Sequence, residues 1–368
     1  MHYQPRDRAP ICDFGFWPET LALWHEQGLP AGITDDDPAS EYFGMDSYGY
    51  GSRPRPNIYL CPTFEHRIVE DRGDHEVVQQ GDGVRVLRKK FMGSIPHHES
   101  HLLVDRQSWK EHYLPRLDPT TVERYPADWD AAVKLWRDTA NRTVPFSLHC
   151  GSLYGRLRDW MGMENLAMVV YDDPAWFEEM VTTLADLTVA ALGRMFEAGA
   201  VIDAGEFWED MCYNSGPLLS PEHFKKYLVP QYQRITGLLR KYGVDVFWLD
   251  CDGKIDALLP LWLEGGVNCM FPMEIGTWGT DPIRYRKEYG KELLMMGGFD
   301  KHILARSKAE IEAEVRRLTP LVEEGGFIGF CDHRVPPDVP MDNYLFYLKT
   351  VRRLWGHDIA LKPLPSPI

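Results

Sequence analysis

The sequence lacks any hydrophobic run long enough to cross a membrane, and it lacks the pattern of a secretory signal. No apolar stretch approaches the ~18 residues that a transmembrane helix needs. The segment MHYQPRDRAP at the start is polar and carries two arginines, unlike a signal peptide. The seven cysteines are scattered, without a CxxC pair, so a disulfide scaffold is not expected. We therefore expect a cytoplasmic protein that does not enter a membrane.

Positive charge is also scarce. There are 40 Lys and Arg residues against 55 Asp and Glu, a formal net charge of −15. A field of this sign repels polyanions, so nucleic acid and anionic membrane surfaces are poor partners and a small-molecule substrate is the better expectation. Hydrophobic residues make up 44% of the chain, which is enough for a large core and excludes a disordered protein.

The nucleotide-binding glycine loops GxGxxG and GxxxxGK[ST] are absent, which counts against a doubly wound sheet. What is present is an alternation of short apolar runs with amphipathic helical patterns. The expected strands span 145–150, 200–207, 244–250, 267–274, 292–300 and 325–332, and the expected helices lie near 173–198, 221–242, 254–264, 281–289, 307–323 and 341–355. Successive βα units form parallel strands with right-handed crossovers. The sequence thus predicts an α/β fold, a (β/α)8 TIM barrel in a single domain over residues 1–368.

Residues 57–95 have a different pattern of apolar and turn residues. Short segments with strand character are separated by turn sequences at Gly73 and around Gly81 and Gly83. This pattern predicts an N-terminal β-meander that leaves the barrel as an excursion. His97, His98 and His101 follow it in an expected loop, where surface histidines are a simpler interpretation than a metal patch.

Polar residues close the expected strands, and this is the main functional signal. Catalytic groups of parallel barrels lie at the carboxyl ends of the strands, so these residues predict one shared pocket. The candidates are His149, Glu209, Asp210, Asp250, Asp252, Glu274, Asp300, Cys331, Asp332 and His333, with Trp208 and Tyr213 as aromatic walls for a flat ligand. Taken singly, each is equally well explained as a solvated loop residue, a helix cap or a structural side chain.

Asp250 and Asp252 flank Cys251 on one strand end, so their side chains should point the same way. Neighbouring carboxylates raise the pKa of one of them, giving a general acid beside a base, or they share a cation. The alternative is that Asp252 caps the helix that begins near Lys254. Cys331 and His333 have a spacing compatible with metal ligation, although a structural histidine is the commoner outcome.

Four separated segments, in the expected order, resemble the uroporphyrinogen decarboxylase superfamily. They are WEDMCYNSGPLLSPEHFKKYLVPQY (208–232), WLDCDGKIDALLPLWLEGGVNCMFPMEI (248–275), LMMGGFDKHIL (294–304) and CDHRVPPDVPMDNYLFY (331–347). The superfamily is a (β/α)8 barrel that includes porphyrinogen decarboxylases and zinc-dependent methyltransferases, which move methyl groups to or from cobalamin or coenzyme M. Homodimers are common in it, so a homodimer is one expectation here.

The chain departs from both branches. True uroporphyrinogen decarboxylases carry an arginine-rich motif where this chain reads DFGFWPETLALWHEQGLP, without arginine, so an octa-carboxylate substrate is not expected. In the methyltransferases, a His-x-Cys pair and a later cysteine bind zinc that activates a thiol. Here Asp250 and Asp252 stand where His and Cys would fall, and Cys331 matches the later cysteine. The resemblance therefore implies zinc held by Cys331 with Asp252, in a harder site unsuited to thiol activation.

The chain looks closer to a set of bacterial homologues with W-E-D-M and D-x-D-G motifs, some of which are thought to act in O-demethylation. We therefore expect a corrinoid-linked methyltransferase that acts on a small methylated donor such as a methoxylated aromatic. The corrinoid-binding signature D-x-H-x-x-G is absent, so cobalamin would arrive on a separate corrinoid protein. Asp250, Asp252 and Glu209 would act as acids or orient the donor, and the other candidates would line the pocket.

Two alternatives remain open at this point. One is a decarboxylase or another lyase on a smaller cyclic acid, in which Asp250 stabilises a cationic intermediate without a metal. The other is a non-catalytic protein that binds a tetrapyrrole or corrinoid. Gathering charged residues at six strand ends is energetically costly unless something uses them, which favours an enzyme.

Overall fold

Parallel strands form the centre of the computed structural model, which describes residues 1–47, 53–90 and 96–356. Six of them are hydrogen-bonded in the order β12-β11-β10-β9-β6-β5. Their bounds are β5 (Ser147–His149), β6 (Ala204–Trp208), β9 (Phe247–Asp250), β10 (Cys269–Met273), β11 (Leu294–Phe299) and β12 (Phe327–Cys331). The order follows the chain without the reversal that defines a doubly wound sheet. All six predicted strands are confirmed.

Side chains of these strands alternate between two cores. The smaller core lies inside the ring of strands and contains Cys12, Val246, Trp248, Cys269, Phe271, Leu294, Met296 and Phe330. The intervening residues, such as Phe247, Leu249 and Cys331, belong to the larger core that the strands share with the helices. A packed interior inside the strands and a second core outside them are characteristic of a (β/α)8 barrel. The predicted fold class is confirmed, with six strands in the parallel sheet of the described ranges.

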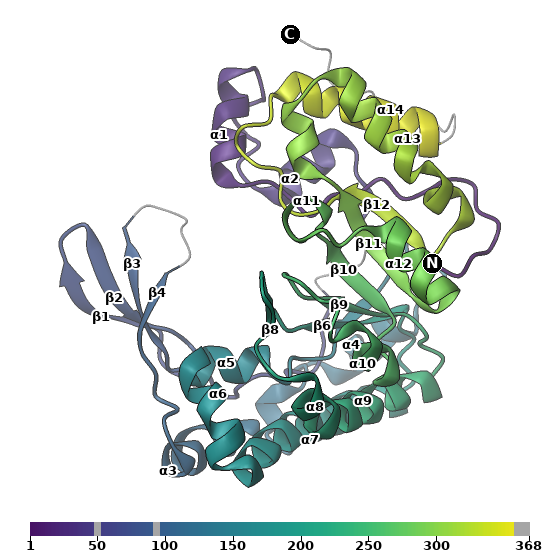
Figure 1. Cartoon of the computed structure of the whole chain (residues 1–368). Helices are drawn as coiled ribbons and strands as arrows, with labels where there is room; N and C mark the ends of the chain where they lie inside the picture. Colours follow the sequence, from purple (N-terminus) through teal and green to yellow (C-terminus); the bar gives the residue numbers. More distant parts are fainter. Residues whose placement is uncertain (48–52, 91–95, 357–368) are drawn as a thin grey trace.

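Helices cover the outside of the barrel (Figure 1). They are α4 (Trp129–Arg137), α5 (Gly155–Met161), α6 (Met163–Asp172), α7 (Pro174–Glu197), α8 (Pro221–His223), α9 (Val229–Lys241), α10 (Leu259–Glu264), α11 (Ile275–Trp278), α12 (Pro282–Tyr289), α13 (Lys308–Glu324) and α14 (Met341–Trp355). Local signals fix their first turns. Asp173 caps α7 and accepts a hydrogen bond from the Trp176 amide, and Ser307 forms a capping box with Glu310 at the start of α13. Each such cap stabilises its helix by about 1 kcal/mol.

The N-terminal segment packs against the C-terminal part of the chain. It contains α1 (Pro18–Glu26) and α2 (Asp36–Phe43). Phe16 forms an isolated parallel bridge with Val335, and the Thr20 hydroxyl donates to the Val335 carbonyl at 2.7 Å. The Tyr344 hydroxyl of α14 donates to the Asp13 carboxylate at 2.8 Å. Segments more than 300 residues apart in sequence therefore close this side of the ring.

The predicted meander is confirmed as an antiparallel sheet that stands away from the barrel (Figure 1). It consists of β1 (Arg67–Arg72), β2 (His75–Gln79), β3 (Arg85–Lys89) and β4 (His97–Ser100). The expectation of a loop at His97 and His98 was wrong, because both residues pair with β3 as a fourth strand. Residues 91–95, at the end of the predicted excursion, lie outside the described ranges.

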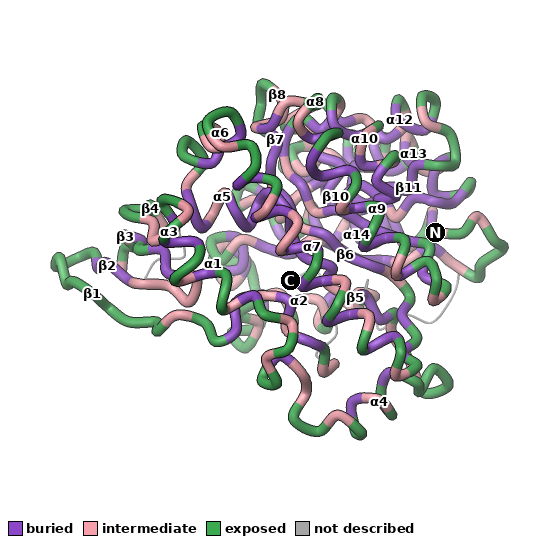
Figure 2. The backbone as a smooth tube through the Cα atoms, turned by 90° about the horizontal axis from the view of Figure 1, so that it is seen from below, coloured by how far each residue is buried: buried purple, intermediate pink, exposed green. Residues whose placement is uncertain are grey.

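Short elements complete the chain. They are α3 (Arg106–Ser108), η1 (Trp109–Tyr113), η2 (Leu114–Leu117), η3 (Val122–Arg124), the hairpin β7 (Cys212–Tyr213) and β8 (Gly216–Pro217), η4 (Phe224–Leu228), η5 (Gly290–Glu292) and η6 (Lys301–Ala305). Figure 2 shows that buried residues follow the barrel strands, whereas β1 is exposed along its length. Among the described helices, none has the length and apolarity that a bilayer crossing requires.

Candidate active site

The alternation of β9 places Asp250 at the carboxyl end of the barrel interior. Val246, just before this strand, and Trp248 within it are interior residues, and the next residue on the same face is Asp250. Cys251 belongs to the outer core, so Asp252 returns to the side of Asp250. The prediction that both aspartates point the same way is confirmed by their oxygens, which lie within 4.8 Å of each other in a group with Asp210.

The three carboxylates of Asp210, Asp250 and Asp252 come from the ends of β6 and β9. The Asp252 amide donates to Asp210 Oδ1 at 3.0 Å, which ties the two strand ends together. Burial, and then the nearby Asp252 charge, raise the pKa of Asp210 to about 6. Burial also raises the pKa of Asp250 well above its usual range, with further contributions from Asp210 and Asp252. Carboxylates at this separation cannot all be ionised without cost, so the group retains protons or attracts a cation.

Asp210 adopts a left-handed backbone conformation with φ of 40°. For a non-glycine residue this conformation costs on the order of 1–3 kcal/mol, and such residues cluster at functional sites. The Arg158 guanidinium from α5 donates to the Asp210 carbonyl and also lies 5.3 Å from the Trp208 ring centroid. Arg158 therefore holds the strained turn in place. It is a residue that the sequence interpretation missed.

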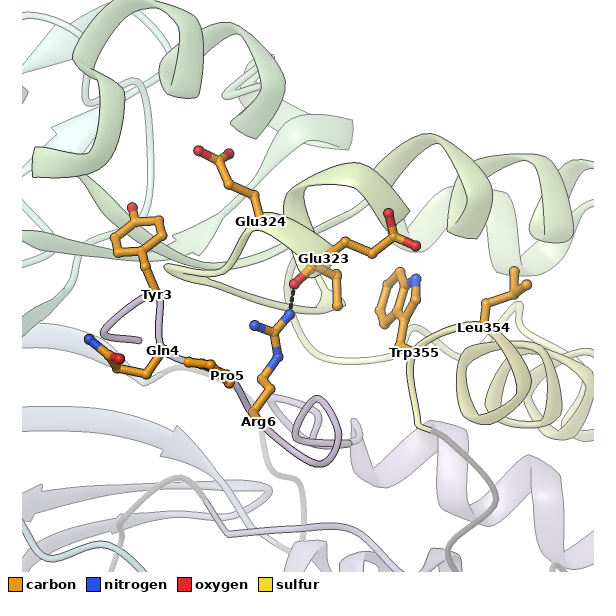
Figure 3. A pocket seen from close by; sticks show the side chains of 9 residues that line it. Tyr3, Gln4, Pro5, Arg6, Glu323, Glu324, Leu354 and Trp355 are labelled. Carbon is orange, nitrogen blue, oxygen red and sulfur yellow. Dashed lines mark hydrogen bonds between the residues drawn. The ribbon is translucent and has the colours of Figure 1, made fainter.

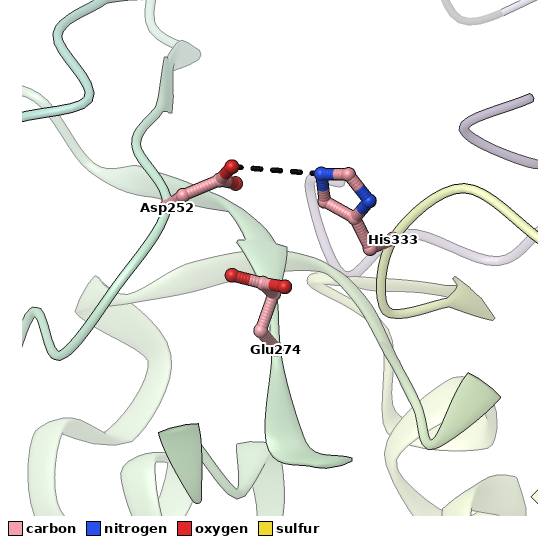
Figure 4. Close-up of side chains that lie close together, drawn as sticks. All are labelled: Asp252, Glu274 and His333. Atoms are coloured by element: carbon pink, nitrogen blue, oxygen red, sulfur yellow. Dashed lines mark ion pairs between the residues drawn. The ribbon is translucent and has the colours of Figure 1, made fainter. Parts of the chain in front are cut away.

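A second group joins Asp252 to Glu274 and His333, with their ligand atoms within 4.8 Å of one another (Figure 4). Glu274 directly follows β10, and His333 lies two residues after β12. His333 Nε2 is 3.5 Å from Asp252 Oδ2. The His333 ring packs edge-on against Phe14 at 5.0 Å and stacks on Trp17 at 6.1 Å, so aromatic contacts fix its orientation.

Lys301 supplies positive charge beside this group. Its ammonium lies 3.2 Å from Glu274 Oε1 and 3.7 Å from Asp332 Oδ1. The Trp278 indole N–H donates to the other Glu274 oxygen at 2.5 Å. Burial raises the pKa of Asp332 to about 6, although Lys301 and two backbone amides lower it. Asp332 is fully buried and anchors the ends of two strands, rather than facing a ligand.

Glu209 is fully buried and its carboxylate is saturated with hydrogen bonds. Its oxygens accept from the Ser152 hydroxyl, from the Tyr232 hydroxyl and from the amides of Leu153, Tyr154 and Gly155. A carboxylate at a helix N-terminus is stabilised by the helix dipole, and here it fixes α5 to the end of β6. Glu209 thus holds the end of β6 in place, and its expected role as an acid or as a group that orients the donor stays a prediction.

Cys331 does not meet Asp252. Phe330 points into the barrel interior, so the next residue of the strand points to the outer core, where Cys331 is completely buried. Among the described residues, neither group of close ligand atoms includes a cysteine. Burial raises the pKa of the Cys331 thiol well above its usual range, which disfavours the thiolate that zinc requires. The expected Cys331–Asp252 pair is not formed, and a thiolate zinc site does not fit these residues.

The remaining candidates are dispersed around the rim of the barrel, the edge formed by the carboxyl ends of its strands. His149 Nδ1 is 3.7 Å from Glu206 Oε1, on the neighbouring strand β6. Asp300 caps η6 and pairs with His302 at 2.9 Å, outside both carboxylate groups. Tyr213 is 50% exposed on the β7–β8 hairpin. Glu206, one of the charged residues near the strand ends, is among the charges that raise the Asp250 pKa.

A cavity of about 430 Å³ lies elsewhere, at the amino end of β12 (Figure 3). It is lined by Tyr3, Gln4, Pro5, Arg6, Val322, Glu323, Glu324, Leu354 and Trp355. The Arg6 guanidinium donates to the Val322 carbonyl in its floor. This end of a barrel supports stability rather than chemistry, so the carboxylate groups at the opposite end are the candidate active site.

Comparison with known proteins agrees with this architecture. Curated relatives include the uroporphyrinogen decarboxylases of Syntrophotalea carbinolica, 26% identical over 57% of this chain and 58% of that protein, and of Geobacter sulfurreducens, 26% identical over 64% and 68%. The match to the first thus spans less than two thirds of its length. A solved methyltransferase from Methanosarcina mazei superposes with a TM-score of 0.56 over 95% of both chains at 14% identity, which shows a shared fold.

A family model gives the assignment directly. The uroporphyrinogen decarboxylase model matches residues 93–354, which is well over half of the chain. The match includes all six barrel strands and both carboxylate groups. The chain belongs to the uroporphyrinogen decarboxylase family.

Proposed function

We propose that the chain is a methyltransferase that moves a methyl group from a small methoxylated donor to a corrinoid carried by a separate protein. The observation that carries this proposal is the convergence of Asp210, Asp250 and Asp252 at the carboxyl end of the barrel interior. Asp250 is the last residue of β9 and follows Trp248 on the interior face. A buried acid in this position suits protonation of a leaving oxygen.

The charge of the rim bears on the substrate class. Asp250 lies near four other carboxylates, those of Glu206, Asp210, Asp252 and Glu274. Lys301 partly offsets this charge at Glu274. A polycarboxylate such as a porphyrinogen would meet repulsion here, whereas a neutral methoxylated aromatic would not. The exposed Tyr213 and the nearby Trp208 offer aromatic surface for such a ring.

The proposed step accounts for the bond that breaks, the electron pair and the proton. The bond between the methyl carbon and the donor oxygen breaks, and the oxygen keeps the electron pair and takes a proton from the Asp250 carboxyl. The reduced corrinoid supplies the nucleophile that accepts the methyl group. Asp210 and Asp252 hold the Asp250 proton in place by their charge, and Glu209 positions the end of β6 that carries Asp210. Water then restores the proton to Asp250.

The experiment is methyl transfer from a methoxylated phenol to a reduced corrinoid, followed by the absorbance of the methylated corrinoid. We expect turnover only when corrinoid is present, and a loss of about 10²–10⁴-fold in kcat for Asp250→Asn, the range for a general acid. Asp300→Asn is the matched control, because it removes a carboxylate from a neighbouring strand end outside both groups. Demethylation by the chain alone, or full activity of Asp250→Asn, would overturn the proposal.

Decarboxylation of a smaller cyclic acid is a second candidate. It is favoured by the named relatives and by the buried Asp250, which in its ionised form would stabilise a cationic intermediate. The two functions differ in their requirement for corrinoid. Release of CO2 from a cyclic acid without corrinoid, sensitive to Asp250→Asn, would select decarboxylation.

A further inference from the structure

Strand β1 forms an open edge of the antiparallel sheet that stands away from the barrel (Figure 1). All six of its residues are exposed. Among the described residues, β2 is the only strand that pairs with it, so its outer edge is free. A free edge presents unpaired N–H and C=O groups, which makes it a template for a further strand. Charged side chains commonly protect such an edge, so the order of the charges along β1 decides what the edge accepts.

The charges of residues 65–72 are self-complementary. The segment reads EHRIVEDR. A second copy of the segment can run antiparallel beside the first, with a two-fold axis between Ile68 and Val69. The facing pairs, each repeated by the axis, are then Glu65 with Arg72, His66 with Asp71, Arg67 with Glu70, and Ile68 with Val69. Cross-strand pairs of opposite charge stabilise an antiparallel sheet, whereas like charges directly opposite each other destabilise it.

Other arrangements of the two strands bring unlike partners together. In a parallel pair in register, every charged residue would face its own copy. An antiparallel pair shifted by one residue places Glu65 opposite Asp71 in one direction and Ile68 opposite Glu70 in the other. Like charges in facing positions are unfavourable, and so is a charge that faces an apolar side chain. The sequence of the segment therefore favours one strand direction and one register.

The middle of the segment also fits a two-fold axis. The ladder between β1 and β2 is irregular between Ile68 and Glu70, so that Val69 has no partner on β2. Such an irregularity increases the local twist of a strand. Because the axis passes through this point, both copies bring the same twist to it. Ile68 is 58% exposed and Val69 is 40% exposed, and a second copy would cover both side chains.

The charges of β1 already have partners within one copy, and these contacts are compatible with a second copy. Arg72 forms an ion pair with Glu70 at 2.8 Å, and Lys90 forms one with Asp71 at 2.7 Å. The side chain of Glu70 is still 54% exposed and that of Asp71 is 66% exposed. A carboxylate accepts several hydrogen bonds, so both can also accept from a facing strand.

We propose that two copies of this chain associate edge to edge through residues 65–72, in an antiparallel two-fold arrangement that joins their two four-stranded sheets into one. Each copy contributes the same residues, so the interface is isologous and the assembly closes as a dimer. The segment precedes residues 93–354, the part of the chain that the family model matches. The interface therefore belongs to the excursion of this chain, and it does not depend on the proposed reaction.

The test uses the full chain and measures its molar mass by analytical ultracentrifugation over a range of protein concentrations. We expect the wild type to change from monomer to dimer as the concentration rises. Arg67→Glu makes both copies of the pair between Arg67 and Glu70 repulsive, and so does Glu70→Arg. Each replacement should therefore weaken the dimer by about tenfold or more. Thermal unfolding of each variant checks that the fold is retained.

A mixture of these two variants gives the sharper measurement. One chain has glutamate at both positions and the other has arginine at both, so the facing pairs are attractive again. We expect a heterodimer at concentrations at which either variant alone is a monomer. Arg85→Glu is the matched control, because it reverses the same charge at an exposed position of β3, which is paired on both sides. This variant should dimerise like the wild type.

Three results would overturn the inference. They are a wild type that stays monomeric at every concentration, a dimer that neither replacement weakens, and a mixture of the two variants that forms no heterodimer. The second result would place the interface on another face of the molecule. High salt concentration should weaken the proposed dimer, because exposed charge pairs are screened. A dimer that is indifferent to salt would contradict the pairing of charges.

Discussion

At the scale of single residues, Glu209 joins the rim to the helical layer. Its five hydrogen bonds come from four residues at the start of α5 and from Tyr232 on α9. Glu209→Gln replaces one acceptor oxygen with a donor group that would face other donors. We expect the free energy of unfolding to fall by about 2–4 kcal/mol, measured by urea denaturation.

Glu264→Gln is the control for this change, because Glu264 forms an exposed pair with Lys225 and should alter stability by less than about 0.5 kcal/mol. The result would distinguish two roles for Glu209. If the variant kept its stability but lost activity, Glu209 would be one of the acids that contact the donor.

The candidate residues differ in how much of their position could be predicted from the sequence. Asp250 and Asp252 were predictable as a pair, because the two-residue period of a strand sets their direction. The same period places Cys331 on the opposite face from Phe330, but the sequence does not say which face of β12 is the interior. Arg158 was missed because its contact with Asp210 depends on how α5 is packed.

At the scale of elements, the β7–β8 hairpin packs on the turn that follows β9. Gly253 has φ of 99°, and a Cβ at this position would lie 2.2 Å from the Cys212 carbonyl oxygen. Only glycine fits both the backbone conformation and this close approach. This explains in physical terms why a glycine follows Asp252.

Gly253→Ala should therefore push the hairpin away from β9. We expect a loss of more than about 2 kcal/mol in stability, from the left-handed strain and the clash together, together with weaker substrate binding at the rim. Denaturant unfolding measures the first effect and KM the second. Gly279→Ala is the control, since Gly279 also has a positive φ but a Cβ there would meet nothing within 4 Å. Equal losses in both variants would show that the hairpin contact is unimportant.

The elements were predicted more completely than the contacts between them. Six strands and the helices after them follow from apolar periodicity, which records burial directly. The strand at His97 and His98 was missed because all four residues of β4 are exposed and carry no apolar alternation. The group formed by Asp252, Glu274 and His333 brings together three strand ends, and the sequence contains no signal for the distances between them.

At the scale of the whole molecule, the buried Asp13 couples stability to pH. Burial raises the pKa of Asp13 to about 7, against a usual value of 3.8, even though hydrogen bonds from Tyr344 and the Phe14 amide lower it. The native state therefore holds a proton between about pH 4 and pH 7 that the unfolded state has released. Stability must fall as pH rises through this window, by up to about 1.4 kcal/mol per unit for this group.

Asp13→Asn should remove this part of the pH dependence, because an amide oxygen still accepts from Tyr344 and carries no charge to bury. We expect a flatter profile of unfolding free energy between pH 4 and pH 7 and a more stable variant above pH 7. Denaturation at several pH values is the measurement. Asp74→Asn, at an exposed position in the turn after β1, should leave the profile unchanged. A profile that Asp13→Asn does not flatten would contradict the assignment.

The contact between the two ends of the chain also has a consequence for biosynthesis. Thr20 and Asp13 find their partners, Val335 and Tyr344, only after more than 300 further residues have been added. Loop closure over such a distance is entropically costly, and folds dominated by distant contacts form slowly. During synthesis, α1 is therefore made long before the segments that cover it. Until then Trp24 and Leu21, which are buried in the finished barrel, remain exposed. During that interval the chain presents apolar surface to chaperones, and the barrel closes only when α14 has emerged.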